Sequence, residues 1–181
     1  METITFEPFP KIARHQRTVV ITEKLDGTNA SIFIGDDGEF LVGSRTRWIT
    51  PGKLTDNYGF AAWAQENKED LLTLGPGHHF GEWWGKGIQR GYGLNERRFS
   101  LFNVSRWFDQ RPVCCHLVPI LYQGANSERH IAEAIHELAR YGSLAVSGFM
   151  DPEGIMIFHT AAGMVFKKTI KDDETPKSLL Q

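Results

Sequence analysis

The spacing of hydrophobic and polar residues changes several times along this chain. Short runs rich in Val, Ile and Phe, separated by Gly, Asp and Pro, predict strands, because β-branched and aromatic side chains suit a pleated, half-buried surface. Tight turns such as Gly35-Asp36-Asp37-Gly38 join neighbouring runs as hairpins. The expected strands cover residues 17–22, 31–34, 39–42, 78–85, 98–104, 111–122, 155–159 and 164–169.

Two segments have apolar residues at the three-to-four spacing of a helix. The first covers residues 55–74 and stops at Gly75-Pro76-Gly77. The second begins after Ser127, a good N-cap residue, and ends at Tyr141, before Gly142. Strands outnumber helices, so we expect an α+β fold in which mostly antiparallel sheets are flanked by a few helices.

Length and charge narrow the possibilities. The chain has 181 residues, 41% of them hydrophobic, and we expect one domain over residues 1–181. Its first segment, 1–16, is irregular and contains Pro8 and Pro10, and its charged tail, 171–181, is peripheral. Twenty Lys and Arg against 22 Asp and Glu give a net charge of −2, so any contact with nucleic acid must come from a local basic patch.

The cysteines and the absence of apolar spans suggest where the protein works. Cys114 and Cys115 are adjacent, so a disulfide between them is not expected, and two buried thiols suit a reducing compartment. Residues 1–10 lack the basic and apolar parts of a signal peptide, and no apolar run approaches membrane-spanning length. We therefore expect a soluble, cytoplasmic protein without membrane contact.

Lys24 stands where the first buried run ends, in the string Glu23-Lys24-Leu25-Asp26-Gly27-Thr28-Asn29. A lysine held there among other cations loses its proton more easily and can act as a nucleophile. The alternative is a solvated lysine before a tight turn, in which Gly27 takes a backbone angle that other residues avoid. A Lys-x-Asp-Gly string occurs by chance in roughly a few per cent of chains of this length, so alone it is only a hint.

Other charged residues also end apolar strands. Because strand ends can direct side chains into one cleft, a shared site is expected for Lys24, Arg45, Glu82, Glu153 and Lys167. Cations neutralise phosphate oxygens and carboxylates hold Mg²⁺, so this set suits a metal-bound polyphosphate. The chain has no Gly-x-x-x-x-Gly-Lys-[Ser/Thr] loop, which leaves a lysine nucleophile attacking phosphorus.

The string around Lys24 resembles motif I of the covalent nucleotidyltransferases, which include polynucleotide ligases and messenger-RNA capping enzymes. The later motifs follow in the family's order, and together they make a strong signal between about Glu23 and Lys168. The flanking Glu and Gly-Thr-Asn are most similar to ATP-dependent RNA ligases of the Rnl2-like group. The matching segments are 43–45 (motif Ia), 80–85 (motif III), 99–104 (motif IIIa), 153–157 (motif IV) and 165–168 (motif V).

This resemblance implies an ATP-grasp-like nucleotidyltransferase core with a nucleotide cleft, and a reaction in three steps. Lys24 attacks the α-phosphorus of ATP and becomes a lysyl-adenylate, AMP passes to a 5′-phosphate, and a 3′-hydroxyl then seals the strand. The implied catalytic residues are Lys24, Asp26, Glu153 and Lys167. The implied nucleotide-binding residues are Glu23, Lys24, Leu25, Gly27, Asn29, Arg45, Glu82, Phe102, Glu153, Lys167 and Lys168.

The resemblance also implies individual roles. Glu23 reads the adenine amino group, Phe102 stacks on the base, and Glu82 contacts the ribose. Arg45 contacts the nucleotide or the incoming 5′-phosphate, and Asn29 helps the sealing step. Glu153 positions Mg²⁺, or Mn²⁺, through water. Lys167 touches the α-phosphate and lowers the proton affinity of Lys24 by repulsion.

Two departures from the family pattern stand out. The last motif usually has lysines two apart, whereas here Lys168 directly follows Lys167, so strand alternation turns it away from the same ligand. The second cation is then absent, replaced by Thr169 or supplied by Lys171. Only 13 residues follow Lys168, too few for the usual OB-fold or helical domain, so the RNA grip falls to the core or to a partner protein.

Each residue also has a structural interpretation. Glu82 and Glu153 are then surface acids, Phe102 is a core aromatic, and Arg45 is solvated. Trp83 and Trp84 are expected to pack, and adjacent His78 and His79 are not expected to bind metal. The basic, glycine-rich loop 86–98 contacts a nucleic-acid backbone or is simply a mobile, solvated loop.

Three functions remain at this stage. The first is an ATP-dependent RNA ligase acting on nicked or broken RNA. The second keeps the chemistry but changes the substrate, to DNA or to GTP-dependent capping; Glu23 argues against guanine, because a carboxylate repels its carbonyl oxygen. The third is a degenerate domain that binds nucleotide or RNA without catalysis.

Overall fold

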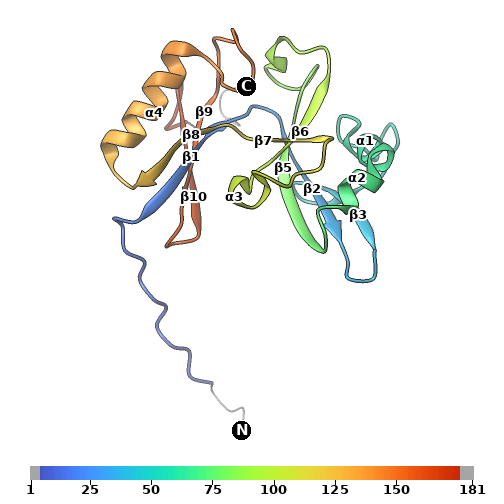
Figure 1. Cartoon of the computed structure of the whole chain (residues 1–181), viewed down its shortest axis with the longest axis horizontal. Coiled ribbons are helices and arrows are strands. Elements are labelled where there is room, and N and C mark those ends of the chain that lie inside the picture. The colour runs from blue at the N-terminus through green and yellow to red at the C-terminus, as the bar shows by residue number, and fades with distance from the viewer. Residues whose placement is uncertain (1–4, 176–181) are drawn as a thin grey trace.

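The computed structural model describes residues 5–175, which form two β-sheets side by side with helices packed against them (Figure 1). Seven of the eight strand pairs among the described residues are antiparallel. The expected α+β architecture of mostly antiparallel sheets with a few helices is therefore confirmed. Within the described residues, no helix is long and apolar enough to cross a membrane.

The first sheet has four strands in the order β10-β9-β1-β8, and all its pairs are antiparallel. Its apolar face packs against helix α4, through Ala134 and Leu138. As expected, the Ser127 hydroxyl caps this helix by accepting from the His130 amide, and Gly142 ends it. The elements are β1 (Thr18–Lys24), β8 (Ile120–Ala125), β9 (Gly154–His159), β10 (Met164–Thr169) and α4 (Glu128–Tyr141).

The second sheet has six strands in the order β4-β3-β2-β5-β6-β7, antiparallel except for the parallel pair β6–β7. Phe60 of α1 packs into its core beside Trp83 and Phe99. The strands are β2 (Thr28–Ile34), β3 (Phe40–Ser44), β4 (Trp48–Ile49), β5 (Gly77–Gly85), β6 (Arg97–Leu101) and β7 (Cys115–Leu117). The helices are α1 (Phe60–Glu66), α2 (Lys68–Leu72), α3 (Val104–Trp107) and the 3₁₀ turn η1 (Gly91–Gly93).

A third apolar cluster joins the two sheets. Val20 and Leu25 come from the end of the first sheet, whereas Trp84 and Tyr92 come from the second sheet and the turn that follows it. All four side chains are at most 5% exposed, so the sheets are held together just beside Lys24. The strand end that carries Lys24 is thus fixed by packing from both sides.

Several predicted boundaries are corrected. The helix expected over 55–74 is two short helices that meet at Asn67. The strand expected over 111–122 is two strands in different sheets, because Pro119 has no amide to continue the ladder. The strand expected over 98–104 ends at Leu101, and α3 then begins at Val104. The two cysteines are free, as expected.

The loop expected to be mobile, residues 86–98, is anchored through much of its length. Ile88 and Tyr92 are completely or almost completely buried, at 0% and 1% exposure. The Tyr92 hydroxyl accepts from the Asp26 amide at 2.9 Å, and Arg90 forms ion pairs with two acids. Packing and ion pairs that the glycine-rich sequence does not reveal therefore fix this segment beside motif I.

Gly27 is required for a different reason from the one that the sequence suggested. It does not have a positive φ angle. A Cβ atom at this position would lie 2.4 Å from the Trp83 carbonyl oxygen and 2.7 Å from Trp84 Cβ. The glycine therefore allows the turn between β1 and β2 to pass close to β5.

Gly27→Ala is expected to lower the free energy of unfolding by roughly 1–3 kcal/mol, because the backbone of β5 must shift to admit the methyl group. Gly38→Ala is a useful control, since Gly38 has a φ of +86° but open space around it. The control should lose only about 1 kcal/mol, from backbone conformation alone. Urea denaturation measures both, and a smaller loss for Gly27→Ala than for Gly38→Ala would contradict the steric explanation.

Candidate active site

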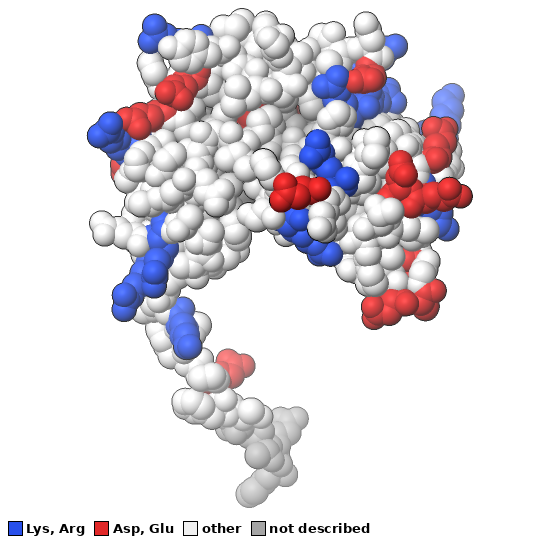
Figure 2. Space-filling model, in the orientation of Figure 1, with Lys and Arg blue, Asp and Glu red and all other residues white. Residues whose placement is uncertain are grey.

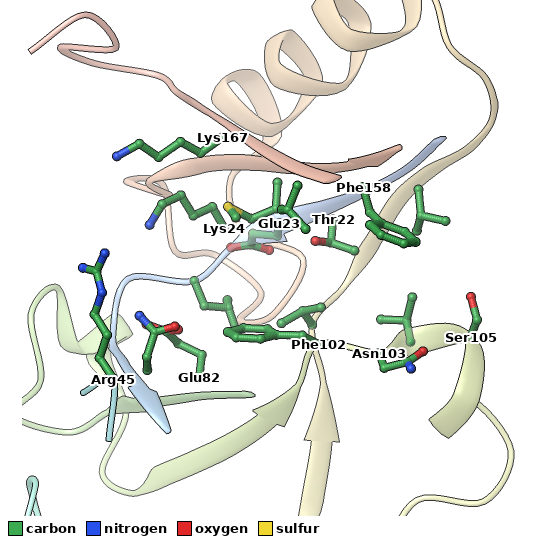
Figure 3. Close-up of a pocket in the computed structure, with 17 residues that line it drawn as sticks. Thr22, Glu23, Lys24, Arg45, Glu82, Phe102, Asn103, Ser105, Phe158 and Lys167 are labelled. Atoms are coloured by element: carbon green, nitrogen blue, oxygen red, sulfur yellow. The ribbon is translucent and has the colours of Figure 1, made fainter. Parts of the chain in front are cut away.

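A cleft of about 630 Å³ lies between the two sheets, a volume within the range of small-molecule sites. Figure 3 shows charged side chains at one end of it, Phe102 and Phe158 further along, and Asn103 and Ser105 at the other end. Its walls come from β1, β9 and β10 on one side and from β2, β5 and the segment around α3 on the other. The predicted site residues that line it are Glu23, Lys24, Leu25, Asn29, Arg45, Glu82, Phe102 and Lys167.

Lys24 is the last residue of β1, and its amine points into the cleft (Figure 3). Antiparallel pairing places Lys24 opposite Gly154, which brings the neighbouring Glu153 within reach. Lys24 Nζ lies 2.6 Å from Glu153 Oε2, and the Glu153 side chain is only 3% exposed. A nearly buried carboxylate therefore holds the amine at the cleft wall, so Glu153 is not a surface acid.

Glu82 is on β5, directly across from Asn29 of β2. Its Oε1 accepts from the Gly27 amide at 3.1 Å, which links it to the turn after Lys24. Burial raises the pKa of Glu82 to about 7, although the positive charge of Lys24 and the Gly27 hydrogen bond oppose the rise. Near neutral pH this carboxyl is therefore present in both protonation states, and it too is not a surface acid.

Glu23 is more enclosed than its expected contact with adenine requires. Its side chain is 0% exposed, and Oε2 accepts from the amides of Leu144 and Ala145 at 2.8 and 3.1 Å. Burial raises its pKa, and Oε1 has no hydrogen-bond partner among the described residues. The observed hydrogen bonds of Glu23 are therefore with the segment that follows α4.

Phe102 is exposed to the cleft rather than to the core. It is 40% exposed, and Figure 3 shows its ring crossing the space below β1. The opposite wall carries Val20, Met156 and Phe158, so an apolar slot lies between these side chains and Phe102, with Asn103 and Ser105 beside it. Such a slot suits a planar aromatic ligand, because aromatic rings prefer stacked or edge contacts with one another.

Cations gather at the other end of the cleft. Figure 3 shows the charged ends of Lys24, Lys167 and Arg45 on the same side of the site, and Arg45 lines the cleft while remaining exposed to solvent. Lys168 turns away, as strand alternation predicts, and its Nζ lies 3.4 Å from Asp173. Lys171 is likewise occupied, 2.8 Å from Asp151. The structure therefore does not bring Lys168 or Lys171 into the cleft.

The structure also places Asp26 outside the cleft lining. Arg90 contacts its carboxylate and reaches Asp151 Oδ2 at 3.3 Å, so one arginine links a residue of motif I to the segment before Glu153. Sequence reasoning missed Arg90, because it stands in a glycine-rich loop without any periodicity. Sequence reasoning also missed Asn103 and Ser105, which line the cleft beside Phe102.

Thr169 does not take the place of the second cation in the cleft. Its amide and hydroxyl both donate to Asp173 Oδ1, at 2.7 and 3.3 Å. Trp83 and Trp84 are 2% exposed and pack in the core, as expected. His78 Nε2 forms a hydrogen bond with the Ser31 hydroxyl, and His79 Nε2 forms one with the Gly75 carbonyl oxygen.

Known proteins resemble this chain in sequence profile and in fold. The profile of the RNA ligase family matches residues 17–175. Curated protein sequences give no significant match. Similar solved structures include RNA ligase from Naegleria gruberi, in two mutants with ATP and Mn and in one form with PPi.

The two mutants are 24% and 25% identical to this chain, with TM-scores of 0.64 and 0.62, and the form with PPi is 25% identical with a TM-score of 0.61. They match 86–87% of this chain but only 50% of the Naegleria chain, so this chain spans about half the length of those relatives. The family profile covers both sheets and the whole cleft, and this chain belongs to the RNA ligase family.

Proposed function

We propose that this chain is an ATP-dependent RNA ligase that carries AMP on Lys24. The observation that supports this most directly is the position of the Lys24 amine, which lies between a slot for a planar base and a group of cations. An ATP molecule laid along the cleft has its base beside Phe102 and its phosphates beside Lys24, Arg45 and Lys167. Solved relatives with ATP and Mn, and with PPi, agree with a nucleotide reaction.

In the first step, the Lys24 amine bonds to the α-phosphorus of ATP, and the bond to the pyrophosphate oxygen breaks. The ammonium must lose a proton first, since only the free amine is a nucleophile. Glu153 Oε2, 2.6 Å away, is positioned to accept that proton. Lys167 then stabilises the negative charge on the α-phosphate and favours the neutral amine by repulsion.

In the next two steps, AMP passes from Lys24 to the 5′-phosphate of an RNA strand, and a 3′-hydroxyl displaces it. Arg45 and Asn29 line the mouth through which that phosphate would enter. Glu82 is assigned to a ribose hydroxyl, because its carboxyl lines the cleft and can form a hydrogen bond with such a group. The RNA partner is a nicked or broken strand, and a DNA strand is the alternative substrate.

A divalent cation fits the acids of the cleft. Glu82 and Glu153 supply the hard carboxylate oxygens that Mg²⁺ prefers, and Mg²⁺ usually binds one or two carboxylates together with waters and phosphates. When bound, the cation would neutralise phosphate charge as pyrophosphate leaves. Among residues 5–175, no three or more His, Cys, Asp or Glu side chains are grouped so that they could hold a metal ion.

The remaining parts of the proposal rest mainly on membership of the family. Asp26 is proposed as catalytic through its link to Arg90, and Glu23 as a determinant of adenine specificity through the segment that it holds. A partner protein is proposed to help grip the RNA, and the cytoplasm is the proposed location.

The test of this proposal is intact-protein mass spectrometry after incubation with ATP and Mg²⁺ or Mn²⁺. The parent protein should gain the mass of one AMP, whereas Lys24→Ala should gain none. Lys53→Ala, which removes an exposed lysine outside the cleft, is the matched control and should behave like the parent. An adduct on Lys24→Ala would assign the nucleophile to another residue, and no adduct on the parent with any nucleotide would leave only a binding domain.

Phe102→Ala is expected to raise the Kd for ATP roughly tenfold, since stacking on an aromatic side chain contributes about 1–3 kcal/mol per base. Phe102→Trp should retain most of the affinity. Phe108→Ala is the control, because Phe108 is 63% exposed and does not line the cleft. Calorimetry on the Lys24→Ala background avoids turnover, and an unchanged Kd for Phe102→Ala would assign this ring to packing.

Glu82→Gln tests the raised pKa of Glu82. The unfolded carboxyl ionises near pH 4.5 and the folded one near pH 7, so the folded protein binds more protons in that window and loses stability as the pH rises through it. The parent should lose roughly 2–3 kcal/mol of unfolding free energy between these values relative to Glu82→Gln. Urea denaturation at several pH values measures this. The same dependence of unfolding free energy on pH in both proteins would contradict a raised pKa for Glu82.

A further inference from the structure

The segment before β1, residues 5–17, has a composition unlike the rest of the chain, and we call it the basic arm. It contains three cations and one acid, a net charge of +2, whereas the whole chain has a net charge of −2. Its cations are Lys11, Arg14 and Arg17, and its aromatic residues are Phe6 and Phe9. The arm is thus the local basic patch that nucleic-acid binding would require of an acidic chain.

The order of residues in the basic arm suits an extended conformation. Pro8 and Pro10 fix their own backbone angles and push the preceding residues away from helical ones. A polyproline II helix has three residues per turn, so positions three apart share a face. One face then carries Phe6, Phe9, Ile12 and His15, and another carries Lys11, Arg14 and Arg17.

The structure anchors only one end of the basic arm. The His15 carbonyl accepts from His159 Nε2 at 2.8 Å, and the Arg17 carbonyl accepts from the Asn126 amide at 2.8 Å. Beyond this anchor, residues 5–14 make no hydrogen bond or ion pair with any other residue in the described range 5–175. Phe6 and Phe9 are 86% and 82% exposed.

The basic arm and Lys24 lie at opposite ends of the same strand. The arm continues into β1, whose seven residues end at Lys24, about 20 Å away along the strand. Figure 2 shows the arm leaving the body at the lower left edge of one half of the molecule, with basic side chains where it joins the body. An RNA strand held by the arm therefore has to extend along the length of β1 to reach the cleft.

We propose that the basic arm binds a single-stranded part of the RNA outside the cleft, an inference that rests on the proposed RNA substrate. Phe6 and Phe9 stack on bases, because every base has an aromatic face and such stacking tolerates any sequence. Lys11, Arg14 and Arg17 contact phosphates and release counterions. Aromatic and basic residues at alternate faces of one extended segment give both contacts to the same strand.

The test is the affinity of the full chain for a 5′-phosphorylated oligouridylate RNA, measured by fluorescence anisotropy at several salt concentrations. Phe6→Ala/Phe9→Ala should raise the Kd about tenfold or more. Lys11→Ala/Arg14→Ala/Arg17→Ala should also weaken binding and lower the slope of log affinity against log salt by roughly 2, since each phosphate contact on a single strand contributes about 0.7. Thermal unfolding checks that each variant folds.

A matched control removes the same charge elsewhere. Lys53→Ala/Arg129→Ala/Arg140→Ala takes away three exposed cations outside the arm and should keep the parent's salt slope to within about half a unit. Equal losses for this control and for the arm variant would overturn the proposal, because only net charge would then matter. RNA binding equal to that of the parent in both arm variants would also overturn the proposal. If Phe6→Ala/Phe9→Ala alone loses self-association, the arm is instead assigned to a protein contact.

Formation of the AMP adduct by the parent protein separates this proposal from the proposed function. RNA binding that depends on the arm, without any adduct, supports the arm and contradicts the ligase chemistry. An adduct together with RNA binding that is independent of the arm supports the chemistry and overturns the arm.

Discussion

The antiparallel pairing of β1 with β9 is the constraint on which the site depends. It sets Lys24 opposite Gly154 and so places the Glu153 carboxylate 2.6 Å from the lysine amine. Glu153 is nearly buried, and a buried carboxylate is costly unless a cation pairs with it. A slip of one residue in this register would turn Lys24 to the other face of the sheet and leave Glu153 without that ion pair. Strand register and chemistry are therefore fixed together.

Much of the site could be predicted from the sequence, because strand ends are marked by changes from apolar to polar residues. Lys24 does end a strand, the second hairpin does carry Glu153 before it and Lys167 on its return, and Lys168 does point away from Lys167. Ser127 and Gly142 bound a helix as their chemistry predicts. Local rules of alternation and capping were sufficient for these features.

Other features depend on contacts between distant segments, which no local pattern reveals. Arg90 joins Asp26 to Asp151 across 64 and 61 positions of the chain. Pro119 sends the chain from the second sheet to the first, although the apolar run around it reads as one strand. Gly27 is needed because of its distance from Trp83, not because of its own backbone angle. Glu23 accepts hydrogen bonds from the Leu144 and Ala145 amides, which belong to the segment that follows α4.

A crystal structure of the protein after incubation with ATP and Mn²⁺ tests the central claim most directly. The account predicts continuous density between Lys24 Nζ and the α-phosphorus, the base beside Phe102, and an open ion pair between Lys24 and Glu153. A nucleotide bound elsewhere, or one held in the cleft while that ion pair stays closed and Lys24 stays unmodified, would contradict it.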